Sequence, residues 1–401
     1  PIYCTLSLWC LPLRLLLITL TMRLNEVELI IIYLGNKCNF DCIYCDRGYI
    51  ENTIGGQTLH LEEVSAMEKF FLEVEKTPNQ IKRVSFHGGE PFLFISKIKK
   101  TMEWLAEIVE RNDWKVSFTT NGSLVKQNED FFERYSGLLT CTVSYDFMYQ
   151  GINRVKKAPS GVKCGECNCV DVCEVDLPNV IEMSKVLNKH CTEWKFQYVV
   201  PIDEPDSLSF KNLSAIVKTC YATECKTINL IPLRHKRGKD KFDVIIDRVN
   251  LPQFFDAFME FVQVLYIKKL NVFIDGQYHN IDKAYFKGHS KLILAPDGYI
   301  YPEFDFLEYK VENAKIGNWQ SSTLYDDEGD EGKIRKDCLE CSSRASCGLK
   351  YLYFLFDEKP KGSCVQFYKI IDFVTLHLTQ LKTKKNLLEW VGIDETFEIK
   401  K

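Results

Sequence analysis

The feature that most constrains this chain is a set of three cysteines, Cys38, Cys42 and Cys45, which stand at C-x3-C-x2-C spacing in one loop. The loop directly follows an apolar segment, residues 27–34. Structural zinc ions and most iron-sulfur clusters take four protein ligands, so a compact set of three thiolates leaves one metal position open for another molecule. The spacing therefore predicts a metal centre that carries chemistry.

A second motif follows another strand-like segment. Residues 83–87 lead directly into Gly88, Gly89, Glu90 and Pro91, and the two glycines allow another group to come close to the backbone. Together the two motifs resemble the radical S-adenosylmethionine (SAM) superfamily. The resemblance implies that the cysteines hold a four-iron, four-sulfur (4Fe-4S) cluster, that SAM chelates its fourth iron, and that the second motif meets the SAM amino group. A zinc knuckle and an ordinary strand-end turn are the alternatives.

Length and composition agree with a metalloenzyme. The chain has 401 residues, 46% hydrophobic and 26% charged, which is enough for a large α/β domain and a smaller one. A net charge of -4 with mixed signs disfavours nucleic acid as a partner. The 17 cysteines are an odd number, which argues against a closed disulfide framework, and ligand-like spacing fits a reducing compartment. We therefore expect a cytoplasmic protein.

The first residues need a separate interpretation because residues 1–21 contain an apolar stretch typical of a signal peptide or a short membrane anchor. Arg14 interrupts this stretch, and no small-residue cleavage site follows it. We expect Met22 to be the native start, residues 1–21 to be upstream-translated or non-native, and the protein to have no membrane contact. A membrane anchor is the alternative.

From Glu26 onward, strand-like and helix-like segments alternate, which is typical of a parallel sheet with crossover helices. The pattern predicts strands near residues 27–34, 83–87, 114–119, 139–145, 194–200 and 227–233. It predicts helices near residues 61–75, 97–110, 179–189, 213–222 and 252–267. Six such units resemble the partial (β/α)6 barrel of radical SAM enzymes, so the expected fold class is α/β.

Further polar motifs also follow expected strands, and ligands of parallel β/α folds gather at the C-terminal ends of strands. Asn121 and Gly122 follow the third strand, and Ser144 and Asp146 end the fourth. The resemblance implies a SAM-binding set of Tyr44, Gly88, Gly89, Glu90, Pro91, Asn121, Ser144, Asp146 and Arg154. In this set Tyr44 would contact the adenine and Arg154 the carboxylate of SAM. Structural alternatives are a plain Asn-Gly turn, a strand-ending serine and a buried tyrosine.

A second cysteine cluster stands beyond the barrel segment. Residues 292–302 predict a hairpin with an Asp-Gly turn, and a complete four-ligand set follows it, Cys338, Cys341, Cys347 and Cys364. Its position resembles the SPASM extension of radical SAM enzymes, which normally holds two auxiliary clusters. Glu303 and Tyr351 stand where that family has cysteines, so we expect one auxiliary 4Fe-4S cluster. Zinc on the same thiolates is the alternative.

These motifs predict three parts of the chain. Residues 22–285 form the barrel, with a cysteine-rich insert at residues 160–175, and residues 286–401 form the SPASM-like extension and a C-terminal helix. The insert contains Cys164, Cys167, Cys169 and Cys173. Zinc, an extra cluster, free thiols and a switchable disulfide all fit these four cysteines.

The resemblance implies that a reduced cluster cleaves SAM to a 5′-deoxyadenosyl radical, which then takes a hydrogen atom from the substrate. SPASM-type enzymes most often oxidise, crosslink or epimerise peptide or protein side chains, so we expect a peptide substrate and a flavodoxin- or ferredoxin-type electron donor. Glu303 or Asp305 would act as a base or a substrate contact where the first auxiliary cluster is missing; solvated loop acids are the alternative. A small-molecule substrate, or a non-catalytic zinc or electron-transfer protein, are the competing functions.

Overall fold

The computed structural model describes the parts of the chain that hold the predicted barrel. The described residues are 27–42, 44–45, 58–156, 172–233, 235–237, 242–244, 249–274, 291–302, 307 and 315–325. Among them no helix combines the length and the apolar character needed to cross a membrane.

A curved sheet of eleven strands organises these residues, in the order β11-β8-β7-β5-β4-β3-β1-β12-β13-β14-β15. The strands from β11 to β12 are all parallel to their neighbours. They are β1 (Leu29–Tyr33), β3 (Arg83–His87), β4 (Lys115–Thr120), β5 (Leu139–Ser144), β7 (Cys191–Val200), β8 (Thr227–Pro232), β11 (Asn271–Ile274) and β12 (Lys291–Leu294).

Three antiparallel strands and two small ladders complete the β-structure. At the β12 edge the sheet continues through β13 (Tyr299–Tyr301), β14 (Gly317–Asn318) and β15 (Thr323–Leu324). Separate two-stranded ladders join β2 (Phe40–Cys42) to β6 (Arg154–Lys156), and β9 (His235–Arg237) to β10 (Phe242–Val244).

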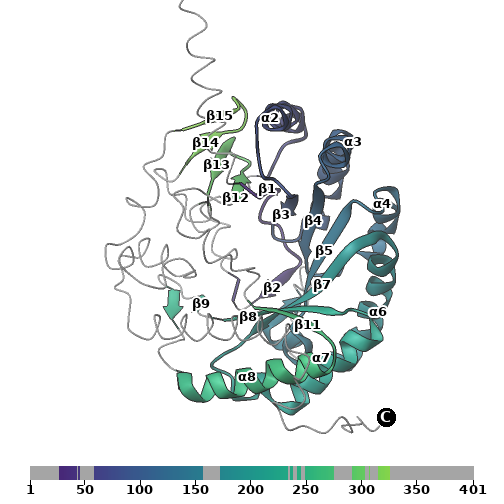
Figure 1. Ribbon diagram of the computed structural model, residues 1–401, viewed down its shortest axis with the longest axis vertical. Coiled ribbons are helices and arrows are strands. Elements are labelled where there is room, and N and C mark those ends of the chain that lie inside the picture. Colours follow the sequence, from purple (N-terminus) through teal and green to yellow (C-terminus); the bar gives the residue numbers. More distant parts are fainter. Residues whose placement is uncertain are drawn as a thin grey trace, which may run out of the picture.

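The helices lie in series along one face of the curved sheet (Figure 1). They are α2 (Val64–Lys76), α3 (Ile95–Arg111), α4 (Glu129–Arg134), α6 (Val172–His190), α7 (Phe210–Ala222) and α8 (Leu251–Ile267). A short helix α5 (Gln150–Asn153) and five single turns of 3-10 helix, η3 (Leu61–Glu63), η4 (Pro91–Phe94), η5 (Lys126–Asn128), η6 (Phe147–Tyr149) and η7 (Pro205–Leu208), lie between them.

This architecture confirms the predicted α/β fold with its partial barrel. Each of the six predicted strands and five predicted helices is present, and the 292–302 hairpin turns at Gly298 with φ of 87°. Sequence pattern does not predict β2, β6, α4 or β11, because segments of three to six residues are too short to show a period. The parallel pairing of β12 with β1 also has no sequence signal. The division of the chain near residue 285 stays a prediction.

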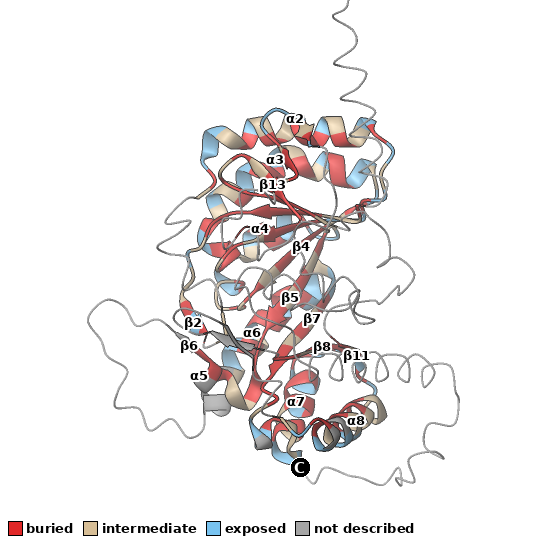
Figure 2. Ribbon diagram, turned by 90° about the vertical axis from the view of Figure 1, so that its left-hand side faces the viewer, coloured by how far each residue is buried: buried red, intermediate tan, exposed pale blue. Residues whose placement is uncertain are grey.

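The two faces of the parallel sheet differ in chemistry. Side chains on the helix face are apolar and buried, among them Val84, Phe86, Val116, Phe118, Cys141, Val143, Phe196, Ile228 and Leu230. The opposite, inner face carries Ser85, His87, Ser117, Thr119, Thr140, Thr142, Ser144, Lys195, Gln197 and Asn229. Figure 2 shows buried residues along the strands and a mixture of buried and exposed residues along the helices. Parallel strands covered by packing on both faces are apolar on both, so the polar inner face indicates a surface for a ligand.

An aromatic cluster supports the strand ends from the helix face. The ring of Phe118 on β4 lies 5.5 Å from that of Phe86 on β3 and 5.1 Å from that of Phe92 in η4, measured between centroids. Phe131 and Phe132 of α4 lie 5.8 and 6.4 Å from the same ring. Because η4 begins directly after the Gly-Gly-Glu motif, this cluster holds the motif against the core.

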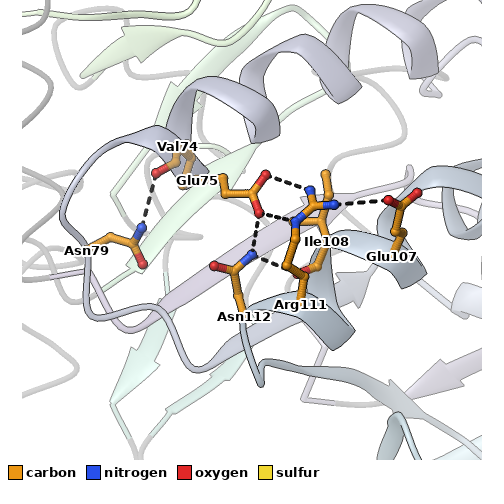
Figure 3. A network of polar contacts seen from close by, with 7 residues as sticks. All are labelled: Val74, Glu75, Asn79, Glu107, Ile108, Arg111 and Asn112. Atoms are coloured by element: carbon orange, nitrogen blue, oxygen red, sulfur yellow. Dashed lines mark hydrogen bonds and ion pairs between the residues drawn. The ribbon is translucent and has the colours of Figure 1, made fainter.

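At the opposite end of the same elements, an ion-pair network joins the last turns of α2 and α3 (Figure 3). Arg111 makes a bidentate pair with Glu75, at 2.6 and 2.7 Å, and a single contact of 3.0 Å with Glu107. Asn112 donates to Glu75 at 2.8 Å. The hydrogen bonds from Arg111 hold the pKa of Glu75 below its usual range. The network lies at the N-terminal ends of the strands, a location associated with stability in β/α folds.

Replacing the central ring of the aromatic cluster tests its role. We expect Phe118→Ala to lower the free energy of unfolding by about 3–5 kcal/mol, because a fully buried ring leaves a cavity among rings that only partly relax. Chemical denaturation of the iron-free chain measures the change. Phe210→Ala is the matched control: its ring is 63% exposed, so its effect should stay within about 0.5 kcal/mol. Equal effects of the two substitutions would contradict the assignment of this core.

Candidate functional site

The candidate site lies where four neighbouring parallel strands end. The sheet order β5-β4-β3-β1 brings together the cysteine loop after β1, residues 88–91 after β3, residues 121–122 after β4 and residues 144–146 at the end of β5. All four strands run in the same direction. The structure therefore places these motifs together at one edge of the sheet, and their roles toward SAM stay predictions.

The two glycines of the second motif are needed by the cysteine loop itself. A Cβ atom on Gly88 would lie 2.7 Å from the carbonyl oxygen of Gly35, and one on Gly89 would lie 2.3 Å from that of Lys37. Two backbone hydrogen bonds hold the approach: Gly89 N donates to Gly35 O at 2.9 Å, and Glu90 N donates to Lys37 O at 2.8 Å. The sequence predicts a close approach here, and the approaching group in the structure is the backbone that leads to Cys38.

Glu90 joins the ends of β3 and β4. Its carboxylate is fully buried and accepts hydrogen bonds from Thr120 Oγ1 at 2.7 Å, Asn121 N at 2.8 Å and Phe92 N at 3.2 Å. Burial raises the pKa of Glu90, and these three donors oppose the rise. The last of them also caps η4. The side chain is thus engaged in fixing the strand ends that carry Gly89 and Asn121.

Asn121 ties its own strand end to the cysteine loop. Its side-chain amide donates to Asn39 Oδ1 at 2.8 Å, and Asn39 in turn donates to Ser123 Oγ at 2.9 Å. Ser123 closes the network by donating to Asn121 Oδ1 at 2.6 Å. Neither Asn39 nor Ser123 is predicted from the sequence, although Asn39 stands between the first two cysteines. Its polar side chain inside a ligand loop is the one signal that could have drawn attention to it.

A short ladder places Arg154 beside the cysteine loop. Strands β2 and β6 pair antiparallel, with Cys42 opposite Arg154 and Phe40 opposite Lys156. The guanidinium of Arg154 lies 5.8 Å from the centroid of the Phe40 ring. Its Nε atom is buried and has no hydrogen-bond partner in the structure. A buried unpaired donor next to Cys42 fits a bound anionic ligand at this position.

Tyr44, Asp146 and Arg154 form a buried polar triad under the loop. Tyr44 Oη donates to Asp146 Oδ2 at 2.8 Å and accepts from Arg154 Nη1 at 2.7 Å. Asp146 also accepts from Val199 N at 3.4 Å. Burial raises the pKa of Asp146 to about 6, against the opposing charge of Arg154. The triad therefore connects the loop residue before Cys45 to the end of β5 and to β6.

Ser144 ends β5 on the inner face of the sheet. The side-chain amide of Gln197 on β7 donates to its Oγ atom at 3.5 Å, and its backbone pairs with the same residue. Ser144 and Gln197 thus form a polar link between adjacent strand ends. Gln197 is a further residue that sequence reasoning misses, because glutamine within a mainly apolar strand carries no motif.

The three cysteines provide thiol donors on a single loop. Cys42 is buried, while Cys38 and Cys45 are partly exposed. Burial raises the pKa of Cys42 to about 12, and the charge of Arg154 opposes this. Within the described ranges, no three Cys, His, Asp or Glu side chains converge on a position for one metal ion. A cluster with several irons can take its thiolates on separate metals, so this donor set fits a 4Fe-4S cluster with one open iron.

Several predicted sites lie outside the described residues. They are the auxiliary-cluster ligands Cys338, Cys341, Cys347 and Cys364, the candidate acids Glu303 and Asp305, and the insert cysteines Cys164, Cys167 and Cys169. For Cys173 only the backbone, in α6, is described. The auxiliary cluster, a metal in the insert and the acid roles stay predictions.

Comparison with known proteins agrees with this geometry. Residues 32–158 match the family model of the radical SAM superfamily. This range begins in β1 and ends just beyond β6, so it contains the cysteine loop and the Gly-Gly-Glu-Pro motif. The probable GTP 3′,8-cyclase of Methanocaldococcus jannaschii is 28% identical over 147 residues, which are 35% of this chain and 45% of that protein. The chain thus spans less than half of the length of this curated relative.

Solved structures resemble a larger share of the chain. Native anSMEcpe with bound AdoMet and a peptide has a TM-score of 0.58 and 17% identity over 89% of this chain and 99% of its own. SuiB of Streptococcus suis bound to S-adenosylmethionine has a TM-score of 0.56 and 17% identity over 88% of this chain and 81% of its own. At this identity the similarity shows a shared fold.

Adding one methyl group tests the docking of the cysteine loop. We expect Gly89→Ala to lose most of the iron and sulfide bound after anaerobic reconstitution, because its Cβ would lie 2.3 Å from a loop carbonyl. Metal analysis measures this loss, and thermal unfolding of the iron-free protein provides a second measurement. Gly137→Ala is the control. This substitution places a methyl group in open space at φ of 86°. The variant should therefore lose about 1–2 kcal/mol of stability but still bind iron.

Removing one hydroxyl tests the polar triad. Tyr44→Phe leaves a buried carboxylate and a buried guanidinium without their shared partner, so we expect the free energy of unfolding to fall by about 1–3 kcal/mol. Urea denaturation of the iron-free chain measures the change. Tyr135→Phe is the matched control, because the hydroxyl of this tyrosine has no described hydrogen bond, and it should change stability by less than about 0.5 kcal/mol. An unchanged free energy of unfolding in Tyr44→Phe would show that the triad does not support the loop.

Proposed function

We propose that this protein, whose residues 32–158 match the family model of the radical SAM superfamily, is an enzyme that uses SAM to abstract hydrogen from a peptide or protein side chain. The observation that carries the proposal is the docking of the cysteine loop on residues 88–90 through two backbone hydrogen bonds. This contact brings a three-thiol donor set next to the polar ends of four strands.

In this proposal Cys38, Cys42 and Cys45 hold the 4Fe-4S cluster. When bound, the cluster and SAM supply the electron transfer and the 5′-deoxyadenosyl radical. The residues of the chain bind and orient SAM. Arg154 offers its unpaired Nε atom to the carboxylate of SAM, and the chain segments around Tyr44, Asn121 and Ser144 form the surrounding surface.

A peptide substrate is favoured over a small molecule by the extent of the similarity. The anSMEcpe structure contains a peptide and matches 89% of this chain, and SuiB bound to its precursor peptide SuiA matches 86% with a TM-score of 0.54. The polar inner face of the sheet is compatible with either substrate. An auxiliary cluster on Cys338, Cys341, Cys347 and Cys364, and a flavodoxin- or ferredoxin-type donor, complete the proposal.

A nucleotide substrate is the second candidate. The Methanocaldococcus jannaschii relative is a probable GTP 3′,8-cyclase, and its similarity of 28% identity exceeds that of the peptide-bound structures. That similarity covers only 35% of this chain. The matching part therefore supports the shared SAM chemistry more strongly than it supports a nucleotide as the substrate.

Anaerobic turnover tests the proposal directly. The full chain is reconstituted with iron and sulfide, reduced with dithionite and supplied with SAM, and 5′-deoxyadenosine is measured by chromatography. We expect product from the wild type and a loss of at least about 100-fold in Cys42→Ala, because the cluster loses one of three ligands. Cys141→Ala, which changes a buried cysteine on β5 outside the loop, should keep its activity. A wild type that binds zinc and no iron would overturn the enzyme assignment.

A further inference from the structure

One charged side chain on the inner face of the sheet has no role in the site described above. Lys195 lies on β7 between Trp194 and Phe196, whose side chains face the helices; Trp194 donates from Nε1 to Asn188 of α6 at 2.6 Å. Side chains alternate along a strand, so Lys195 points to the inner face together with Gln197. It is therefore a partly buried ammonium on the side of the sheet where the motifs of the candidate site end.

The register of the sheet places Lys195 close to that site. Thr142 on β5 pairs with Lys195, and two residues further along Ser144 pairs with Gln197. With strands about 4.8 Å apart and a rise of about 3.3 Å per residue, the Cα atoms of Lys195 and Ser144 are roughly 8 Å apart. The side chain itself extends toward the other neighbour: its ammonium lies 5.3 Å from the centroid of the Phe273 ring, and β11 is on the opposite side of β7 from β5. A group bound by its ammonium would therefore lie on the inner face of the sheet, on the β11 side of β7.

Lys195 is not neutralised within the described part of the chain. Its described contact is with an aromatic ring, 5.3 Å from the ammonium nitrogen to the centroid of Phe273 on β11. Burial and the nearby charge of Arg83 lower the pKa of Lys195, and Glu193 opposes them. Glu193 is exposed and lies nearer the start of β7. A partly buried ammonium whose described contact is an aromatic ring is in a position that favours binding an anion.

We propose that Lys195 binds a carboxylate of the substrate, so that the peptide modified by this protein carries an acidic residue that lies against the inner face of the sheet. This inference rests on the proposed function. One ammonium flanked by neutral groups on adjacent strands, Thr142 and Thr227, matches a group with a single negative charge. A triphosphate carries several charges and calls for a cluster of cations, which the described residues near Lys195 do not form.

Stability separates a binding role from a structural one. Lys195→Met keeps the length of the side chain and its contact with Phe273 but removes the charge. If the ammonium serves a ligand, its removal relieves an unpaired charge, and the midpoint of thermal unfolding should rise by roughly 1–4 °C. A lower midpoint would mean that the ammonium supports the fold, and it would overturn the inference. Lys218→Met, at an exposed position of α7, should leave the midpoint unchanged.

Protection of Lys195 from chemical modification measures binding without knowledge of the natural substrate. The amine of Lys195 is methylated reductively in the reconstituted full chain. Peptide mass spectrometry measures the rate of methylation at Lys195 and, for comparison, at Lys218. The probes are N-acetyl-Gly-Glu-Gly amide, the matching Gln tripeptide, and GTP. We expect the Glu probe to slow methylation of Lys195 about threefold at twice its dissociation constant, with no effect on Lys218 and none from the Gln probe.

The outcomes distinguish this inference from the proposed function. Equal effects of the Glu and Gln probes, or protection by GTP alone, would overturn the assignment of a carboxylate. Formation of 5′-deoxyadenosine together with absent protection would overturn only the role of Lys195. Protection without 5′-deoxyadenosine from the wild type would instead count against the proposed function and leave the anion site intact.

Discussion

The contact on which the candidate site depends is the docking of one backbone segment on another. Residues 35–37 lie against residues 88–90 so closely that a side chain on Gly89 would overlap a carbonyl oxygen at 2.3 Å. Two backbone hydrogen bonds hold this contact. Because backbone atoms are less free to move than side chains, the position of the cysteine loop is set by the sheet rather than by the loop itself.

Buried polar groups then connect the loop to strands that are distant in sequence. Glu90 links β3 to β4, Asn121 links β4 to the loop, and the triad of Tyr44, Asp146 and Arg154 links the loop to β5 and β6. Buried charges cost free energy unless they are paired. Their cost is offset here only when all the strand ends are in place, so assembly of the site is coupled to assembly of the sheet.

The two faces of the sheet also differ in role: the helix face stabilises the fold, and the inner face is suited to binding. Its helix face is built from rings and branched side chains that are completely buried, as around Phe118. Its inner face carries hydroxyls, amides and the ammonium of Lys195, which are costly in a core and useful toward a ligand. The helices thus stabilise the strands from one side, while the polar side chains of the other side lie on the face that leads to the cysteine loop.

The sequence by itself determined the order and type of the main elements and the identity of the motif residues. Strand and helix periods are local properties, and the spacing of Cys38, Cys42 and Cys45 is visible in a single line of letters. Tertiary structure alone decided which side chains meet. Arg154 lies opposite Cys42 because β2 and β6 pair although these two residues are 112 positions apart in the chain. Asn39 reaches Asn121 because parallel strands bring their ends together. Such contacts arise from long-range packing. The segments that make them are too short to show a period, and a single polar residue forms no motif, so the sequence does not reveal them.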